Sequence, residues 1–444
     1  MTMNLKQTEQ GLRLKVGYLA ISLALAVTMT FSAAGNTPSR LEKFSAMRYG
    51  IFIHNVYKLT VAPEGVNYNT PDEFANLFDV NGFANQMESA GVEYVYFTAW
   101  HYNMVLLGPN ATLDKWLPGH TTKRDLVGEL ADALNAKGIA LVIYAHPNDG
   151  HDFSPEEQTK VGYIKYDKAN PQPIPVFNDF INEVYAELAD RYNEKPNVLG
   201  FWWDSWKENG ERIDGKRLRA TVAAKFPGAI VLSNNFDKEC IDLFSAERNY
   251  KQDAGDIEQL FVCASNQTFP SAGGWWNGSL KARCTFSPET LFKFTVLNAG
   301  TGAPGGVCWA VSPLADGTTW GSNNQPLNAL IKANQYLKPI RETVCGVAPS
   351  KNWLVPDQAT FSKAPAFTAT RSLDGKKEYI HVLKAPSGKC IELPAPTESF
   401  KAATFFKNAK PVKLETGAES LKLTLGEGDT WDALDTVIVL EVEG

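Results

Sequence analysis

Several features are missing from this chain, and each absence excludes a class of protein. The six cysteines among 444 residues are scattered, with no CxxC pair and no metal-ligand spacing, so buried thiols are as good an interpretation as disulfides. After the first thirty-odd residues no apolar run is long enough to span a bilayer. The formal net charge of -6 provides no basic surface for nucleic acid or anionic lipid. No tandem repeat, low-complexity tract or long linker occurs either.

The N-terminal segment has the pattern of an export signal. Lys6, Arg13 and Lys15 form a basic head, residues 17–31 are apolar, and the small residues 32–34 resemble a cleavage site. This apolar run is short for a membrane span, although an uncleaved anchor is the alternative. We expect residues 1–34 to be a signal peptide. The mature protein would then be secreted or periplasmic, with no membrane association after cleavage.

The mature chain, about 410 residues, exceeds one ordinary core and should form two domains. In the first part, apolar runs alternate with amphipathic helical patterns. The predicted strands are residues 49–54, 94–100, 140–146, 199–204, 230–234, 260–264 and 307–311, and the predicted helices are 81–90, 122–137, 176–192, 213–225, 287–299 and 324–340. Apolar strands alternating with helices indicate a parallel sheet covered on its outside. We predict a (β/α)₈-type barrel, of the α/β class, over residues 41–345.

The composition changes near Cys345, and residues 346–444 contain only strand and turn patterns. Residues 378–383 and 436–441 alternate apolar and polar side chains, and residues 373–375 carry a turn signal. Such a pattern is typical of a small antiparallel β-sandwich. We therefore expect a C-terminal sandwich after the barrel.

Polar and aromatic residues stand where the predicted strands end, which is where this type of barrel places its active site. Asp204 is the most informative of them, because it follows two tryptophans at the end of an apolar strand. A carboxylate among flat rings suits a site where a sugar stacks while its anomeric carbon is attacked. The other candidates are His54, Trp100, His101, Tyr102, Tyr144, His146, Trp202 and Asn235.

The cluster of histidines allows two chemical interpretations. Three imidazoles with an aspartate could bind zinc, but the spacing lacks an HxH or HExxH element. Histidines that donate hydrogen bonds to sugar hydroxyls explain the pattern as well, so we expect no metal and no other cofactor. Alternation along a strand points Trp202 and Trp203 in opposite directions. We favour Trp202 for the pocket because it shares a face with Asp204, and expect Trp203 to be packing.

Several segments together resemble the α-L-fucosidases, glycoside hydrolase family 29. The similarity begins in the strand at residues 47–54 and continues through 90–101, then 124–127, then the strand at 201–204, and finally the turn at 312–317. Each segment is weak by itself, but their order and spacing match the family. The resemblance also includes the C-terminal sandwich, and so extends over nearly the whole mature chain.

The resemblance implies roles for individual residues. Asp204 corresponds to the catalytic nucleophile, while His54 and His101 would bind sugar hydroxyls and Tyr144 and Trp202 would wall the pocket. The general acid/base lies in the family on a variable loop after the sixth strand. Residues 245–247 resemble the triplet that carries it, which favours Glu247. The second candidate is Glu258.

Other positions depart from the family pattern. Tyr102 replaces a second histidine, Trp100 replaces a lysine, Asn103 replaces an aspartate, and Asn55 replaces a tryptophan. An arginine common after the fifth strand is also missing. Because several of these positions touch the sugar in the family, the chain reads as a divergent member, and its sugar could be a relative of L-fucose such as L-galactose.

These observations predict a secreted, exo-acting glycosidase that releases α-L-fucose or a related L-sugar from an oligosaccharide or polysaccharide. Two carboxyl groups separated by about 5 to 5.5 Å would act by retaining double displacement, whereas a gap of about 6.5 to 9.5 Å would imply inversion. A barrel that binds carbohydrate but has lost its chemistry is one alternative. A metal-dependent hydrolase built on the histidines is another.

Overall fold

The structure is a computed structural model that describes ten stretches of the chain. These are residues 38–204, 212–234, 236–247, 256–261, 263–264, 283–284, 287–311, 313–317, 325–355 and 365–443. Side chains are not described at residues 246–247, 256–264, 283–284 and 325–326. The predicted signal peptide lies outside the described residues. Pro38–Gly444 form one compact unit.

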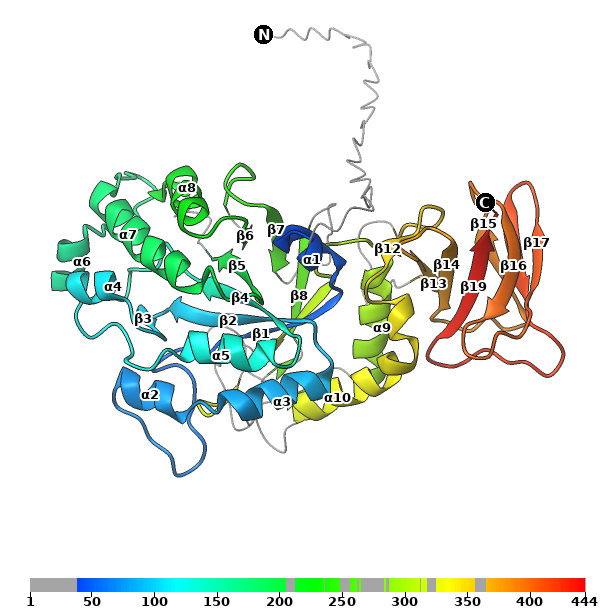
Figure 1. The fold of residues 1–444 in the computed structure, drawn as a ribbon, viewed down its shortest axis with the longest axis horizontal. Coiled ribbons are helices and arrows are strands. Elements are labelled where there is room, and N and C mark those ends of the chain that lie inside the picture. The colour runs from blue at the N-terminus through cyan, green and yellow to red at the C-terminus, as the bar shows by residue number, and fades with distance from the viewer. Residues whose placement is uncertain are drawn as a thin grey trace, which may run out of the picture. The chain divides into compact units, whose positions relative to one another are not determined.

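Eight parallel strands close into a ring in the first part of the chain (Figure 1). Their order is β1-β11-β8-β7-β6-β5-β4-β2, and β2 pairs with β1 to complete the circle. The strands are β1 (Tyr49–Ile53), β2 (Tyr94–His101), β4 (Ala140–Ala145), β5 (Val198–Trp203), β6 (Ile230–Ser233), β7 (Leu243–Glu247), β8 (Asp256–Phe261) and β11 (Val307–Val311). The predicted barrel is therefore confirmed. Three short strands, β3 (Val105–Leu106), β9 (Cys263–Ala264) and β10 (Arg283–Cys284), accompany it.

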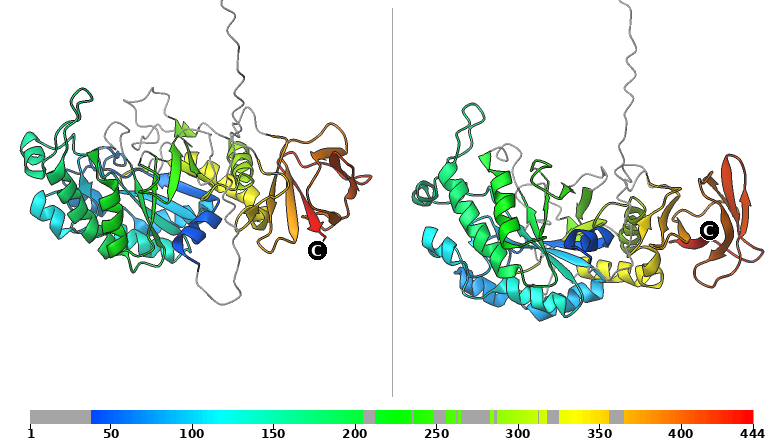
Figure 2. Two further views of the ribbon diagram at one scale, coloured as in Figure 1. Left: turned by 90° about the horizontal axis from the view of Figure 1, so that it is seen from above. Right: turned by 45° about the horizontal axis from the view of Figure 1, so that its top comes forward.

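Helices cover the outside of the ring, as the alternating pattern predicts. The described helices are α1 (Arg40–Ala46), which closes one end of the barrel, and α2 (Pro71–Leu77), α3 (Val80–Ala90), α4 (Ala111–Trp116), α5 (Leu126–Asn135), α6 (Pro155–Val161), α7 (Pro175–Tyr192), α8 (Gly215–Lys225), α9 (Pro288–Ala299) and α10 (Gln325–Leu337), followed by the 3₁₀ helix η3 (Lys338–Thr343). Around the barrel, α9 packs on α10, α10 on α3, and α3 on α5, while α7 packs on α8 (Figure 2). None of the described helices combines the length and apolar character that a membrane span requires.

The interior of the barrel is filled by side chains from alternate strand positions. Phe52, Tyr96, Tyr144, Trp202 and Leu232 belong to one buried cluster, which is distinct from the larger core between strands and helices. Alternate residues of a strand point to opposite faces, so this cluster is the inner layer of the barrel.

Helix α1 closes the amino-terminal end of this layer. Its capping box joins Ser39 and Glu42 at the first turn, and the helix buries Phe44 completely. The Phe44 ring lies 5.0 Å from the ring of Tyr94, at the start of β2. A side chain on Gly305 would clash with Phe44, because its Cβ would lie 2.6 Å from the ring. Phe44 therefore seals the amino-terminal end.

Strand β7 corrects one expectation from the sequence. We expected Glu247 on a loop, but it is the last residue of β7, the sixth strand of the ring in chain order. The segment 243–247 is too short and too mixed in polarity to be recognised in the sequence as a buried strand. It forms a strand because it pairs with β6 on one side and with β8 on the other. The next strand, β8, also begins before the predicted residue 260, at Asp256.

The last part of the chain forms two antiparallel sheets, as predicted for a sandwich. One contains β12 (Ala348–Pro349), β13 (Phe367–Arg371), β14 (Lys377–Val382), β19 (Thr436–Val442) and β16 (Phe400–Phe405), and the other β15 (Cys390–Pro394), β18 (Ser420–Thr424) and β17 (Lys413–Thr416). Ile380 and Ile438 of the first sheet share a buried cluster with Leu393 and Leu421 of the second. The division of the chain at Cys345 remains a prediction.

Candidate active site

The inner layer of the barrel changes from apolar to polar toward the carboxyl ends of its strands. On β1 the interior residue Phe52 is followed two positions later by His54, and on β4 Val142 is followed by Tyr144 and then His146. Both histidines and Tyr144 are buried. Because parallel strands end on the same side of a barrel, these tips meet there, which is the face that carries active sites in this architecture.

Asp204 follows the last residue of β5 and is held from two sides. The hydroxyl of Tyr144 donates a hydrogen bond to Oδ2, and Nδ2 of Asn234 donates one to Oδ1 at 3.2 Å. Its backbone N–H donates to the carbonyl of Ala145 at 3.3 Å. The residue is only partly buried. A carboxylate fixed by two donors, with a part of its surface open, can act on a bound molecule without first reorienting.

An aromatic stack lies directly below Asp204. The rings of Tyr144 and Trp202 lie 5.0 Å apart with an interplanar angle of 19°, and Phe52 lies 6.0 Å from Trp202. Trp203, one position along β5, points into the outer core instead, 5.4 Å from Phe236. The two tryptophans thus face opposite sides, as the alternation of the strand predicts. All three rings of the stack are buried, so they support Asp204 from within the barrel.

His54 occupies the tip of β1 in a fully buried position. Its Nδ1 lies 2.7 Å from the hydroxyl oxygen of Thr98, and its ring meets Tyr144 edge-on at 5.0 Å. Burial lowers the pKa of His54 well below its ordinary value of 6.5, and the charges of His101 and His146 lower it further. The imidazole is therefore neutral at neutral pH, so each ring nitrogen is a donor or an acceptor but not a cation.

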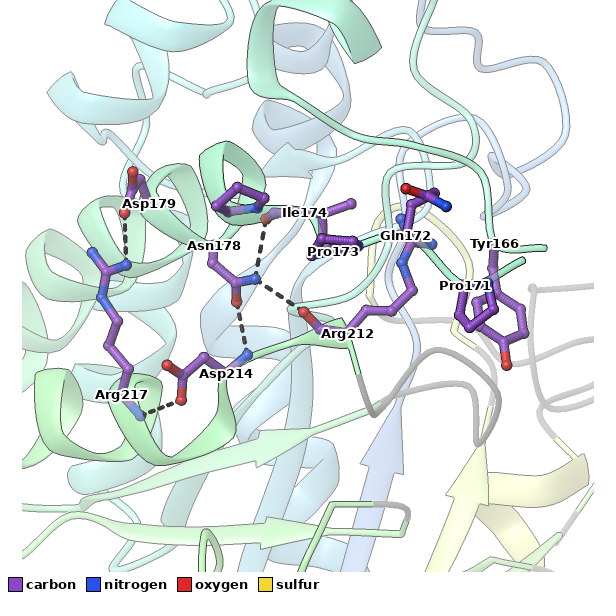
Figure 3. A pocket seen from close by; sticks show the side chains of 11 residues that line it. Tyr166, Pro171, Gln172, Pro173, Ile174, Asn178, Asp179, Arg212, Asp214 and Arg217 are labelled. Atoms are coloured by element: carbon purple, nitrogen blue, oxygen red, sulfur yellow. Dashed lines mark hydrogen bonds and ion pairs between the residues drawn. The ribbon is translucent and has the colours of Figure 1, made fainter. Parts of the chain in front are cut away.

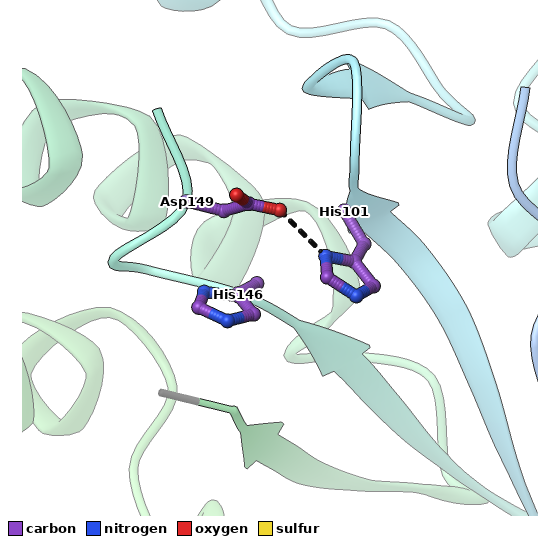
Figure 4. A group of neighbouring side chains, drawn as sticks. All are labelled: His101, His146 and Asp149. Atoms are coloured by element: carbon purple, nitrogen blue, oxygen red, sulfur yellow. Dashed lines mark hydrogen bonds and ion pairs between the residues drawn. The ribbon is translucent and has the colours of Figure 1, made fainter. Parts of the chain in front are cut away.

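His101, His146 and Asp149 form a compact group beside these residues (Figure 4). His101 is the last residue of β2, and its Nδ1 lies 2.7 Å from Oδ2 of Asp149. The rings of His101 and His146 stack at 4.9 Å with an interplanar angle of 18°. Burial lowers the pKa of His146. One potential ligand atom from each residue lies within 4.8 Å of the others, so the group has the composition of a cation site.

Asp149 connects most of this group. Its Oδ2 accepts from His101 and from the backbone N–H of Tyr102 at 3.0 Å, and its Oδ1 lies 2.6 Å from Nδ1 of His151. Burial would raise the pKa of Asp149, but His146, His101 and His151 outweigh it and hold that pKa well below 3.8. The carboxylate is thus ionised, and both of its oxygens already have partners. The hydrogen bond to Asp149 fixes the orientation of the His101 ring, as a carboxylate often does for a catalytic histidine.

The structure corrects the prediction for Trp100. Its ring is fully buried in the outer core, 5.9 Å from Tyr185 of α7, and its Nε1 donates to the carbonyl of Met104 at 2.8 Å. The pairing of β2 with β4 shifts register between Thr98 and Trp100, which is a β-bulge. The extra residue reverses the alternation, so His101 points inward and Trp100 packs against a helix. Tyr102 lies at the rim, with its ring 6.0 Å from His151.

The remaining predicted residues lie at the limit of what the structure describes. Asn235 lies outside the described residues, and its neighbour Asn234 is the residue that contacts Asp204. Strand β6 has Ile230 and Leu232 in the inner layer. Because every second residue of a strand shares a face, this alternation predicts that Asn234 also points inward. Glu247 and Glu258 belong to β7 and β8, but their side chains are outside the described part.

Sequence reasoning also missed Thr98 and Asp149. Thr98 shares the inner face of β2 with Tyr96, and the alternation of the strand was the signal that could have found it. Asp149 lies in a loop beyond β4, three residues after His146. The run of Asp149, His151 and Asp152 is a local cluster of titratable groups, but nothing in the spacing shows that the loop folds back onto His101.

Comparisons with known proteins agree with this architecture. The model of the family described as "Alpha-L-fucosidase" matches residues 57–267. A Caenorhabditis elegans protein that carries the name of an α-L-fucosidase is 25% identical over a stretch covering 37% of this chain and 36% of that protein. The matching stretch thus spans about a third of that relative.

Solved structures of α-L-fucosidases share the fold over most of the chain. Isoenzyme 1 from Paenibacillus thiaminolyticus is 18% identical with a TM-score of 0.65, covering 91% of this chain and 99% of its own. The GH29 enzyme from Bacteroides thetaiotaomicron is 18% identical with a TM-score of 0.65, covering 92% and 96%. The Thermotoga maritima α-fucosidase is 19% identical with a TM-score of 0.64, covering 90% and 97%. The resemblance seen in the sequence is confirmed, and the low identity is that of a divergent chain.

Proposed function

We propose that this chain, a divergent member of the α-L-fucosidase family, is a glycosidase that releases a terminal α-L-fucose or a related L-sugar from a glycan. The observation that carries the proposal is the position of Asp204. It stands at the carboxyl end of β5, holds hydrogen bonds from Tyr144 and Asn234, and lies above the stacked rings of Tyr144 and Trp202. Family relatives that bear the name of α-L-fucosidases support the choice of substrate.

The proposed reaction is a retaining double displacement. The Asp204 carboxylate attacks the anomeric carbon while the aglycone leaves with a proton from a second carboxyl group, and water then cleaves the resulting ester with the second group as base. The neutral imidazole of His54 and the ring of His101 would bind hydroxyls of the sugar. Secretion through the N-terminal signal would bring the enzyme to extracellular or periplasmic glycans.

Hydrolysis of aryl glycosides tests this proposal directly. The purified protein should hydrolyse aryl α-L-fucoside or aryl α-L-galactoside, and Asp204→Ala should lower kcat by about 10⁴-fold or more, because the nucleophile is removed. Asp190→Ala is a matched control, because Asp190 is an exposed aspartate on α7 whose ion pair is with Lys225. Full activity in Asp204→Ala with an intact fold would exclude the mechanism.

The second carboxyl group is proposed to be Glu247, at the end of β7. Glu247→Gln should lower kcat by about 10²- to 10⁴-fold for poor leaving groups, because these need protonation. For aryl glycosides whose leaving group departs without a proton, the rate of the first step should fall much less. The ratio of kcat/KM between the two kinds of leaving group measures the effect, with Glu258→Gln as the control. An unchanged ratio in Glu247→Gln would shift the role to Glu258 or elsewhere.

A carbohydrate-binding barrel without catalysis is the second candidate. It is favoured by the replaced positions at the tip of β2, where Tyr102 and Asn103 stand in place of the family's residues. Asn103 also adopts a positive φ of 61°. Binding of L-fucose in calorimetry, together with no release of sugar from a broad panel of aryl glycosides, would select this alternative over the enzyme.

A further inference from the structure

A hollow opens on the carboxyl-end face of the barrel, in the connections that follow β4 and β5 (Figure 3). Its volume is about 480 Å³, and its wall includes Tyr166, Pro171, Gln172, Ile174, Asn178 and Arg212. Asp204 and Arg212 are the two ends of a single connection after β5. This pocket, hereafter the Arg212 pocket, was not predicted from the sequence.

Arg212 is the unusual residue of this pocket. Only 8% of its surface is exposed, yet its Nε and Nη1 make no hydrogen bond of ordinary geometry within the described part of the chain. Nη2 donates to the carbonyl of Ile164, and the guanidinium lies 5.6 Å from the ring of Tyr163 and 5.8 Å from that of Tyr166. Tyr163 offsets a part of the desolvation cost of this buried guanidinium, and an anionic ligand would offset more of it.

Of the other charged side chains of the pocket, two form an ion pair with each other and the third caps a helix. Arg217 lies 2.6 Å from Asp179, and Asp214 caps α8 by accepting the backbone N–H of Arg217 at 3.0 Å. Among the described side chains that line the pocket, Arg212 is thus the cation that has no carboxylate partner. Asp214 keeps its negative charge, so the positive potential is local to Arg212 and to the start of α7 rather than a property of the whole pocket.

The start of α7 adds to this positive potential. Ile174 occupies the N-cap position and offers no side-chain acceptor to the first turn of this 18-residue helix. Ile174 and Pro175 both line the pocket. An uncapped helix amino terminus favours a negative group beside it, because the helix dipole is positive at that end. Arg212 and α7 therefore favour the same kind of ligand independently.

Tyr163 joins this pocket to the candidate active site. Arg212 lies over the Tyr163 ring, and the ring packs against Gly150, where a Cβ atom would approach Cδ2 of Tyr163 to 2.7 Å. Gly150 is the residue after Asp149, which holds His101. Arg212 and the candidate active site therefore lie in neighbouring loops at the carboxyl ends of the strands, joined by packed side chains.

From this geometry we propose that the Arg212 pocket binds an oxyanion, either a sulfate ester or a carboxylate, on the part of the glycan beyond the terminal sugar. The proposal rests on the proposed function for its substrate, and it narrows that substrate to anionic glycans. Arg212 provides the charge and the hydrogen bonds, and the amino terminus of α7 provides a second positive pole.

Calorimetric titration of the full chain carrying Asp204→Ala, which prevents turnover, tests the proposal. The probes are a sulfated fuco-oligosaccharide, its desulfated form and a uronic acid-containing oligosaccharide, all at one ionic strength. At least one anionic probe should bind about tenfold or more tightly than the neutral one, since a charge-assisted hydrogen bond is worth that much. The preferred probe identifies the source of the anion, and equal affinities for all three would overturn the proposal.

Variants assign the effect to Arg212. Arg212→Gln should remove the preference for the anionic probe while leaving the affinity for the neutral one. Arg219→Gln is the matched control, because Arg219 is an arginine of α8 that pairs with Asp242 and stands outside the pocket lining, and it should keep the preference within about twofold. Equal weakening of all probes by Arg212→Gln would overturn the proposal.

A competition experiment covers the case in which Arg212→Gln fails to fold. Inorganic sulfate, compared with chloride at equal ionic strength, should displace the anionic probe but not the neutral one. Displacement of neither would overturn the proposal. Because no hydrolysis is measured, a negative result leaves the proposed glycosidase standing, and a failure of aryl fucoside hydrolysis leaves this binding result standing.

Discussion

The two ends of the barrel interior use the same strands for opposite purposes. At the amino-terminal end, Phe44 and Tyr94 pack in a fully buried contact, and the Tyr94 hydroxyl donates to the carbonyl of Gly305 at 2.9 Å. At the carboxyl end, Tyr144 donates a hydrogen bond to the partly open carboxylate of Asp204, and His54 bonds Thr98 and packs edge-on against Tyr144. The stability of the fold should therefore depend mainly on the amino-terminal end of the barrel, and catalysis on the carboxyl end. Substitutions that separate the two properties test this comparison.

The largest expected effect is on stability, from Phe44→Ala. Removing a fully buried ring should lower the free energy of unfolding by about 3 to 5 kcal/mol, because the transfer free energy is lost and a cavity remains. Denaturant unfolding measures the change. At a temperature where the variant is folded, kcat on an aryl glycoside should match that of the parent. A collapse of kcat in the folded variant would contradict the division between the two ends.

Tyr144→Phe should instead lower the catalytic activity. It removes the hydroxyl that donates to Asp204 but keeps the ring that stacks on Trp202. A hydrogen bond to a charged group is worth about 1.5 to 3 kcal/mol, so kcat/KM should fall by about 10- to 150-fold. Tyr96→Phe is the matched control, since Tyr96 is a buried tyrosine of the same inner layer. Equal activities for the two variants would break the comparison.

The smallest expected effect is a pH dependence from His54. Its pKa is lowered in the folded chain, so below pH 6.5 the unfolded state binds a proton that the folded state does not. Stability should therefore fall as the pH decreases from 6.5 toward the folded pKa, by at most about 1.4 kcal/mol per pH unit for this residue. Unfolding free energies at several pH values should show a flatter slope in His54→Gln. An unchanged slope would show that His54 is not the neutral buried group described above.

Much of the barrel could be predicted from the sequence because its strands are buried on both sides and its helices are amphipathic. Seven strand positions and six helices follow directly from apolar runs and from the 3.6-residue period. Strand β7 was not predicted because it is short and mixed in polarity, and it forms a strand only by pairing with β6 and β8. Placing Glu247 on a loop followed from the same omission.

Within the candidate site, the errors have local physical causes. Simple alternation along β2 would place Trp100 inside, but the bulge after Thr98 turns it outward and brings His101 inward. Alternation along β6 selects Asn234 from the two asparagines that follow the strand, whereas Asn235 was the one predicted for the substrate site. Asp149 depends on how a loop folds back, and Arg212 on how two loops meet, and neither fact is encoded in strand or helix periodicity. Tertiary contacts decide such positions.

The central claim is that the carboxylate of Asp204 attacks the anomeric carbon, and covalent trapping tests it most directly. A 2-deoxy-2-fluoro-α-L-fucosyl fluoride should react with the protein by forming an ester between Asp204 and the anomeric carbon while fluoride leaves, because the 2-fluoro group slows hydrolysis of that ester. Mass spectrometry of proteolytic fragments should then find the added sugar on the fragment that contains Asp204. A sugar bound to another residue, or catalytic turnover of aryl α-L-fucosides with no adduct at Asp204, would contradict the account.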